Sequence, residues 1–260
     1  MLKGKNIDFS YSKDKDFIKN LNIEIPKGKV TTILGPNGSG KSTLLSILSC
    51  FNKPQNGDVY LDDMKLSKLK YKEIAKHIAC VHQHNRAPED IDVETLVSYG
   101  RSPYKKNIKE DQRLIDFAIE ATNLCDIKNE KVMDLSGGQR QRAFIAMSLA
   151  QNTMVLLLDE PTTYLDIYHQ IEILEVVKKL NEEHNITIVM VLHDINQAIK
   201  YSHNIVIMKN GEIINEGTPE NIIDENIIKE VYQVEGLIGK DEDEIYFIPR
   251  KSLLGGVYSE

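Results

Sequence analysis

The chain has 260 residues, of which 41% are hydrophobic and 27% are charged, as expected for a globular protein with an ample core. Its formal net charge of −7 disfavours nucleic acid as the main partner, because a phosphate backbone selects basic surfaces. No apolar run reaches the roughly 18 residues of a membrane-spanning helix and the first residues lack the apolar segment of a signal peptide, so we expect a cytosolic protein that only another chain would hold at a membrane.

The first third of the chain is predicted to consist of strands. Residues 6–11, 21–35 and 57–66 carry alternating polar and apolar residues, with glycine at the turns. From about residue 70 to 149 the apolar residues follow helical spacing instead. We therefore expect an antiparallel sheet near the start of the chain and a helical insertion at about 85–150.

Short, buried strands are predicted again in the second half. Residues 154–160 and 186–194 form apolar runs, and each is followed by a helix-like segment, which is typical of a parallel sheet covered on both faces. Residues 202–219 read as a hairpin with its turn at Asn210-Gly211. Residues from about 235 to 260 read as a short accessory strand region. The chain is thus predicted to be one α/β domain over residues 1–260.

A glycine-rich loop lies between a predicted strand (30–34) and a predicted helix that begins at Ser42. It matches the phosphate-loop pattern G-x-x-x-x-G-K-[ST], whose backbone amides and helix N-terminus cradle the phosphates of a nucleotide. Lys41 would supply a point charge and Ser42 a ligand for Mg²⁺. The alternative is a glycine-rich turn with a chance lysine. The predicted nucleotide-binding residues here are Gly35, Pro36, Asn37, Gly38, Ser39, Gly40, Lys41, Ser42 and Thr43.

Two carboxylates follow the buried strand Val155–Leu158. Asp159 is placed at the carboxyl end of the strand, where ligands bind in open α/β sheets, and is predicted to hold the metal. Glu160 would point to the opposite side of the strand line and is the candidate general base for an attacking water. The alternative is that the pair only ends a strand.

The segment "LSGGQRQR" opens another helix, and its bare N-terminus would accept a second phosphate. Here the sequence resembles the ATP-binding cassette (ABC) ATPases over nearly the whole chain, which implies a P-loop NTPase cassette that hydrolyses ATP. The resemblance implies that Ser136, Gly137, Gly138 and Gln139 face the γ-phosphate of ATP bound by a second copy. Two cassettes would then hold two ATP molecules head to tail.

Three further positions each match one residue of the family pattern. Tyr11 matches the aromatic residue that stacks on adenine, although a tyrosine alone is more often core or surface filling. Gln83 matches the Q-loop glutamine, which touches Mg²⁺ or the attacking water. His193 matches the switch histidine at the γ-phosphate; its alternative is a strand-end histidine with local hydrogen bonds. Asp194 is predicted to cap the helix that follows.

The D-loop is the visible departure from the family pattern. Leu165 and Asp166 match, and Asp166 is counted among the nucleotide-site residues, but Tyr164 stands where alanine is common. The contact that this loop makes in a dimer is therefore left open.

Two motifs resemble the importer ATPases for ferric siderophores, haem and cobalamin. Gly100, Arg101 and Pro103 match "GR-x-P"; Asp166, Ile167, His169 and Gln170 match "LDI-x-HQ". The first motif is otherwise a polar turn between helices. The resemblance implies a groove for a permease's coupling helix on the helical region, with Tyr99 and Tyr104 as contact candidates.

The resemblance thus implies an ATPase subunit, using ATP and Mg²⁺, on the cytoplasmic face of the membrane. Its partners would be a second copy, permease subunits and, indirectly, an extracellular substrate-binding protein. The alternatives are an ABC ATPase that serves as an assembly or scaffold factor, and a nucleotide-binding regulator without catalysis. Siderophore, haem and cobalamin remain open as cargo, with an iron chelate favoured.

Overall fold

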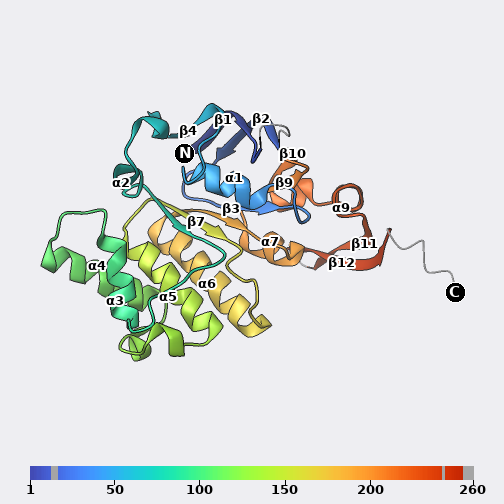
Figure 1. The fold of residues 1–260 in the computed structure, drawn as a ribbon. Coiled ribbons are helices and arrows are strands. Elements are labelled where there is room, and N and C mark those ends of the chain that lie inside the picture. Colours follow the sequence, from blue (N-terminus) through green and yellow to red (C-terminus); the bar gives the residue numbers. More distant parts are fainter. Residues whose placement is uncertain (13–16, 242–243, 254–260) are drawn as a thin grey trace.

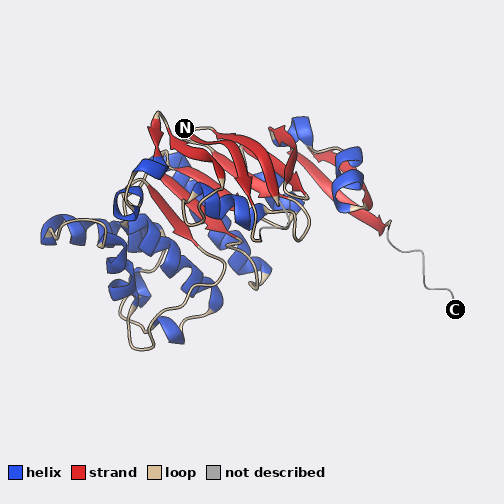
Figure 2. Cartoon of the chain, turned by 45° about the horizontal axis from the view of Figure 1, so that its top comes forward, coloured by secondary structure: helices blue, strands red, loops and turns tan. Residues whose placement is uncertain are grey.

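The computed structural model describes residues 1–12, 17–241 and 244–253. This part of the chain contains a four-stranded antiparallel sheet, a six-stranded mainly parallel sheet and a two-stranded hairpin. Most helices from the middle of the chain, green to yellow in Figure 1, gather below the sheets, and the two-stranded hairpin, in red, projects to the right (Figures 1 and 2). Within the described residues, no helix is both long and apolar enough to cross a membrane.

The six-stranded sheet is the central layer, in the order β10-β9-β3-β8-β7-β6. Its strands are β3 (Val30–Leu34), β6 (Ile78–Val81), β7 (Val155–Asp159), β8 (Thr187–Val191), β9 (Asn204–Lys209) and β10 (Glu212–Gly217). All neighbours are parallel except β9 and β10. Every residue of β3 and β8 is buried; the apolar run at 186–194 predicted this for β8, whereas β3 was predicted as part of an alternating segment and also buries Thr31 and Thr32. The hairpin turn predicted at Asn210-Gly211 is confirmed, with φ of 52° and 84°.

The antiparallel sheet holds the N-terminal strands, in the order β2-β1-β4-β5. Its members are β1 (Leu2–Phe9), β2 (Ile18–Ile25), β4 (Asn56–Leu61) and β5 (Met64–Lys65). Helix α1 (Lys41–Leu48) buries its apolar side chains in the cluster that this sheet shares with one face of the central sheet. The helix that starts at the phosphate loop is therefore anchored by both sheets.

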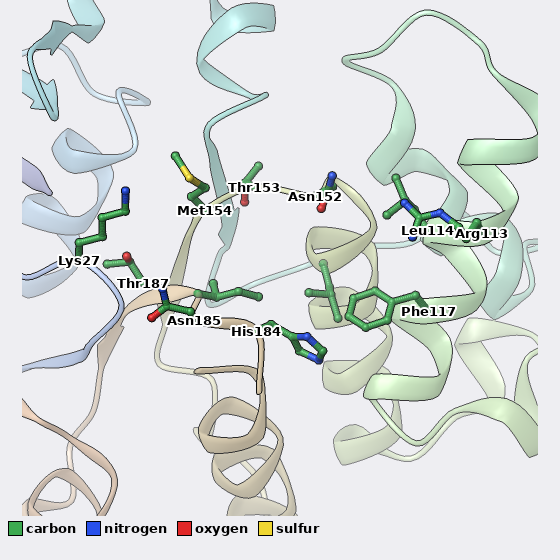
Figure 3. A pocket seen from close by; sticks show the side chains of 12 residues that line it. Lys27, Arg113, Leu114, Phe117, Asn152, Thr153, Met154, His184, Asn185 and Thr187 are labelled. Carbon is green, nitrogen blue, oxygen red and sulfur yellow. The ribbon is translucent and has the colours of Figure 1, made fainter. Parts of the chain in front are cut away.

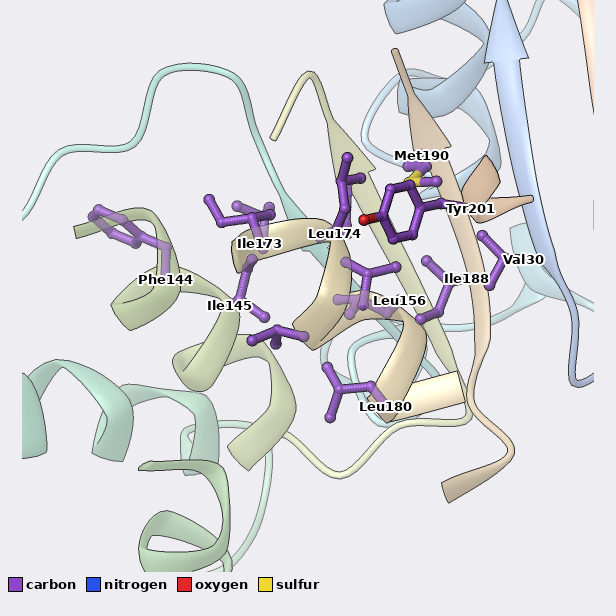
Figure 4. Packing of buried hydrophobic residues seen from close by; sticks show 14 of the residues in the cluster. Val30, Phe144, Ile145, Leu156, Ile173, Leu174, Leu180, Ile188, Met190 and Tyr201 are labelled. Carbon is purple, nitrogen blue, oxygen red and sulfur yellow. The ribbon is translucent and has the colours of Figure 1, made fainter. Parts of the chain in front are cut away.

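All of the remaining helices except the short one at Tyr71–Ile74 contribute apolar residues to the core on the other face of the central sheet, and we call those between residues 93 and 150 the helical layer. The remaining helices are α2 (Tyr71–Ile74), α3 (Val93–Ser98), α4 (Ile108–Ala121), α5 (Gly137–Ala150), α6 (Ile167–His184), α7 (Ile195–Tyr201), α8 (Pro219–Ile222) and α9 (Glu225–Tyr232). Alternate residues of β8 divide between the two cores: Ile188 and Met190 pack toward α5 and α6, as Figure 4 shows, whereas Val189 and Val191 pack toward α1. The mostly helical middle of the chain is confirmed, apart from the short strand β6.

The predicted accessory region forms the hairpin of β11 (Val234–Asp241) and β12 (Glu244–Ser252). Residues 242–243 and 254–260, which that prediction also included, lie outside the described residues.

The "GR-x-P" motif has a structural explanation. The buried Arg101 guanidinium donates to Asp111 Oδ1 at 2.8 Å and to the Ala150 carbonyl at 3.0 Å, and Tyr104 covers it with a ring centroid at 4.0 Å. A Cβ on Gly100 would lie 2.1 Å from the Met147 carbonyl oxygen, so only glycine lets this turn approach α5. The motif ties three parts of the helical layer together.

Candidate active site

The phosphate loop joins β3 to α1. Gly38 and Gly40 have φ of 78° and 104°, in the left-handed region that favours glycine. Within the loop, the Lys41 ammonium donates to the carbonyls of Gly35 (2.9 Å) and Pro36 (3.1 Å). Burial lowers the pKa of Lys41, while the charges of Glu160 and Asp159 act in the opposite direction. A buried lysine so close to backbone carbonyls can exchange them for phosphate oxygens.

Ser42 and Asp159 come together from different elements. The Ser42 hydroxyl, in the first turn of α1, donates to Asp159 Oδ1 at the end of β7 at 2.8 Å. Burial raises the pKa of Asp159 above its ordinary value, partly offset by this hydrogen bond. Two hard oxygen donors at this spacing form a donor set of the kind that Mg²⁺ prefers.

Glu160 lies at the centre of a hydrogen-bonded cluster. Its Oε1 lies 2.8 Å from His193 Nε2, and its Oε2 accepts from the Gln83 amide at 2.6 Å and from the Thr163 hydroxyl at 3.0 Å. Sequence motifs far apart in the chain, Gln83 and His193, thus meet at one carboxylate. Thr163 was not predicted as a site residue, although its spacing of three from Glu160 is the local signal that could have shown it.

The predicted side of Glu160 is wrong. Strand alternation placed its side chain opposite that of Asp159, but Glu160 lies beyond the end of β7 with φ of 49°. This left-handed residue turns the chain, so Glu160 lines a cavity of about 290 Å³ beside the phosphate loop. Both carboxylates therefore face the loop.

Tyr11 lies at the mouth of the same cavity. Its side chain is 70% exposed, and its hydroxyl is 2.6 Å from Thr43 Oγ1, within the phosphate-loop helix. Phe9 meets the ring edge to face at 5.0 Å, and Phe17 also lines the cavity. An exposed, supported aromatic face beside a phosphate site is suited to stacking on a base.

The signature segment begins α5, as predicted. Ser136 is the N-cap, and its hydroxyl accepts from the backbone N–H of Gln139 at 3.3 Å. In return, the side-chain oxygen of Gln139 accepts from the backbone N–H of Ser136 at 2.9 Å. None of the described residues that line the phosphate-loop cavity comes from this segment; Gly137 instead lines a separate hollow with Gln83 and Arg86. The two predicted anion sites of one chain therefore do not share a cavity.

The D-loop connects Glu160 to α6. Asp166 caps α6 by accepting from the His169 amide at 3.0 Å, and the predicted cap of α7 by Asp194 is likewise confirmed. Tyr164 has φ of 64° and is 86% exposed, so its ring lies largely in solvent.

A cavity of about 560 Å³ lies at the opposite edge of the sheet (Figure 3). Met154, before β7, and Thr187, the first residue of β8, place it at the amino ends of the strands, with Arg113 and His184 from α4 and α6. None of the predicted site residues lines it. Several of the predicted site residues instead line the smaller cavity at the carboxyl ends of the strands, where open α/β sheets bind ligands.

A phosphate loop, a converging Ser-Asp pair, a carboxylate held by glutamine and histidine, and a separate signature helix define a P-loop ATPase of the cassette class. The family model described as "ABC transporter" matches residues 18–163, more than half of the chain. The chain therefore belongs to the ABC transporter family of ATP-hydrolysing cassettes.

Relatives of this chain agree with that assignment. The iron(3+)-hydroxamate import ATP-binding protein FhuC of Bacillus subtilis is 45% identical, with 88% of this chain and 86% of that protein covered. The petrobactin import ATP-binding protein FpuC of Bacillus anthracis is 42% identical, with 100% and 97% covered. A dimeric ATP-binding cassette solved in a post-hydrolysis state with ADP and Pi is 34% identical, covers 84% of this chain and 99% of its own, and has a TM-score of 0.74.

Proposed function

We propose that this chain is the ATP-hydrolysing subunit of an importer for an iron chelate, with ferric siderophores favoured over haem or cobalamin. The observation that carries the proposal is the complete hydrolytic cluster around Glu160 in a chain whose relatives are named for siderophore import. Residues 1–260 would form a single nucleotide-binding domain, with the helical subdomain at about 85–150 and the accessory region at about 235–260.

The phosphate loop would bind ATP through the amides of residues 35–43 and the Lys41 ammonium. Tyr11 would stack on the adenine. Mg²⁺ would be held by Ser42 and Asp159, with Gln83 close by, and when bound would neutralise charge on the β- and γ-phosphates. The 2.8 Å contact between Ser42 and Asp159 supports this ligand pair.

Glu160 would accept a proton from the water that attacks the γ-phosphorus, so that the water oxygen forms the new bond while ADP leaves with the β–γ bridging oxygen. Gln83 and His193 already contact this carboxylate and would orient it and the transferred phosphoryl group. The charge on that group would be stabilised by hydrogen-bond donors fixed in advance.

Completion of the site would require a second copy. Ser136, Gly137, Gly138 and Gln139 open α5 away from the phosphate-loop cavity, so they would meet ATP held by the other copy. The two copies would pair head to tail, with Asp166 and the exposed Tyr164 at their contact. ATP binding would close this pair, and hydrolysis would reopen it.

The membrane partner would be a permease that this protein reaches as a peripheral subunit on the cytoplasmic face. Tyr99 is 47% exposed on the helical layer and is a candidate contact, whereas Tyr104 is partly covered by Arg101. An extracellular substrate-binding protein would be linked only indirectly, through the permease.

The decisive experiment is to purify the tagged chain from detergent-solubilised membranes, identify the co-purifying membrane protein and reconstitute the pair in liposomes. We expect a ferric siderophore with its binding protein to stimulate ATP hydrolysis more than haem or cobalamin does. Stimulation by a different cargo would correct the substrate. Robust ATP turnover without any polytopic membrane partner would favour an assembly factor over an importer.

A further inference from the structure

His169 lies against the signature helix. A Cβ placed on Gly138 would be 2.6 Å from the His169 Cγ and 2.8 Å from its Cβ, so the absence of a side chain at Gly138 lets the ring reach the α5 backbone. His169 Nδ1 is 2.9 Å from Glu172 Oε2, which also pairs with the buried Arg142 of α5 at 2.5 Å. Burial would raise the pKa of Glu172, but these two hydrogen bonds outweigh that effect and hold the pKa below its ordinary value. The first turn of α6 is thereby tied to the signature segment.

Gln170, the next residue, makes two connections in other directions. Its side-chain amide donates to the carbonyl of Leu165 in the D-loop at 2.9 Å. Its oxygen accepts from the Gln197 amide at 2.7 Å. Gln197 lies in the first turn of α7, whose N-cap, Asp194, directly follows His193. One side chain therefore links the D-loop to the helix that follows the histidine of the Glu160 cluster.

Leu165 of the D-loop also lies next to the signature segment, because its Cδ2 would be 3.0 Å from a Cβ placed on Gly137. The D-loop thus touches the signature segment directly as well as through α6. Neither His169 nor Gln170 is a fully buried core residue, so filling the apolar interior does not explain the pair. Their polar atoms point to three segments that surround the nucleotide sites.

We infer that His169 and Gln170 are positioning residues that hold the signature helix, the D-loop and the start of α7 in one register. The inference rests on the proposed function, in which the signature and the D-loop serve the second copy's ATP whereas His193 serves this copy's own ATP. A fixed register between these segments would make closure over one ATP favour closure over the other, which is a coupling between sites.

The test separates nucleotide binding from pairing. The variants Gln170→Met and Gln197→Met remove the polar links at similar volume, and His169→Leu removes the ring nitrogen that meets Glu172. Each is made in the full chain carrying Glu160→Gln. A fluorescent ATP analogue reports binding to dilute single copies, and sedimentation reports ATP-driven self-association.

We expect analogue affinity within about 2-fold of the parent and self-association weakened by about 5-fold or more, the usual lower range of a coupling between sites. The double variant Gln170→Met/Gln197→Met should be no weaker than the weaker single variant, because both changes break the same link. Ile171→Ala, on the same turn and without a polar partner among the described contacts, is the matched control and should change neither quantity.

Unchanged self-association in both Gln170→Met and His169→Leu overturns the inference, and so does an equal loss of analogue affinity, which would indicate a general structural effect. If the Glu160→Gln parent binds the analogue but never self-associates with ATP, the two-copy site itself is wrong. That outcome is distinguishable, because it appears before any substitution at 169 or 170.

Discussion

The two halves of the candidate site are held in opposite ways. Around the phosphate loop, the functional groups bond to one another: Lys41 to loop carbonyls, Ser42 to Asp159, and Glu160 to three side chains. At the signature segment, a capping box between Ser136 and Gln139 occupies two backbone amides, and His169 of α6 packs closely against the buried Gly138. In the proposed function the first half would exchange polar contacts between distant segments when nucleotide binds, whereas the second half is held by a local capping box and by close packing.

This difference has an energetic meaning. Exchanging one hydrogen bond for another costs little net free energy, so the polar cluster can rearrange around phosphates without unfolding. A backbone held by close packing has no such freedom, because overpacking costs about 1–3 kcal/mol. Substitutions in the first half should therefore change rates, and those in the second should change stability and pairing.

The sharpest test of the first half is Glu160→Gln. Loss of the general base should lower ATP turnover by about 10²- to 10⁴-fold while ATP binding is retained, so that the ATP-bound dimer accumulates. Phosphate release and size-exclusion chromatography measure the two effects. Glu182→Gln, an exposed position on α6, is the control. Unchanged turnover in Glu160→Gln would remove this residue from the base role.

The second half is tested by Gly138→Ala. The added methyl would clash with Cβ and Cγ of His169, so we expect a loss of about 1–3 kcal/mol in the free energy of unfolding, measured by urea denaturation. Gly137→Ala is the matched comparison, because its methyl meets only the movable end of Leu165, at 3.0 Å. Equal stability of the two alanine variants would break the contrast between the halves.

A smaller effect is expected from Thr163→Val, which removes one hydrogen bond to Glu160 at nearly constant volume. A hydrogen bond of this kind contributes about 0.5–1.5 kcal/mol, so the free energy of unfolding should fall by up to that amount, and the same loss of support for Glu160 in the transition state should lower turnover by roughly 2- to 13-fold. Thr163→Ser keeps the hydroxyl and should retain most of the activity. A Ser variant as slow as the Val variant would show that the methyl group matters instead.

The smallest expected effect is the pH dependence of stability at Asp159. Burial raises its native pKa above the unfolded value of about 3.9, so the native state binds more protons between those two values. The contribution of Asp159 to stability therefore falls as pH rises through that window. Asp159→Asn should gain stability relative to the parent over the same interval, measured by denaturation at several pH values. A constant difference across pH would contradict this direction.

The contiguous motifs made much of this site predictable. The phosphate loop, the strand ending in Asp159 and the helix opened by Ser136 each carry their chemistry within a short segment, where spacing and flanking pattern suffice. The buried strands were equally clear, because continuous apolar runs such as 186–192 leave few other interpretations.

Contacts between distant segments were not predictable from one sequence. Nothing local shows that Gly138 lies against His169, or that Gln170 meets Gln197, because tertiary packing sets these pairs. The side of Glu160 was mispredicted since strand alternation fails one residue past the strand, where the chain turns left-handed. Resemblance identified His169 and Gln170 as a motif but gave no reason for them.

The exposed Tyr164 of the D-loop is a suitable position for a fluorescent reporter. The chain contains no tryptophan, so Tyr164→Trp would introduce a single indole at a site where the ring is 86% exposed to water. Its emission would shift to shorter wavelength whenever another surface covers it. The association of two cassettes could then be followed in real time, without attaching a dye.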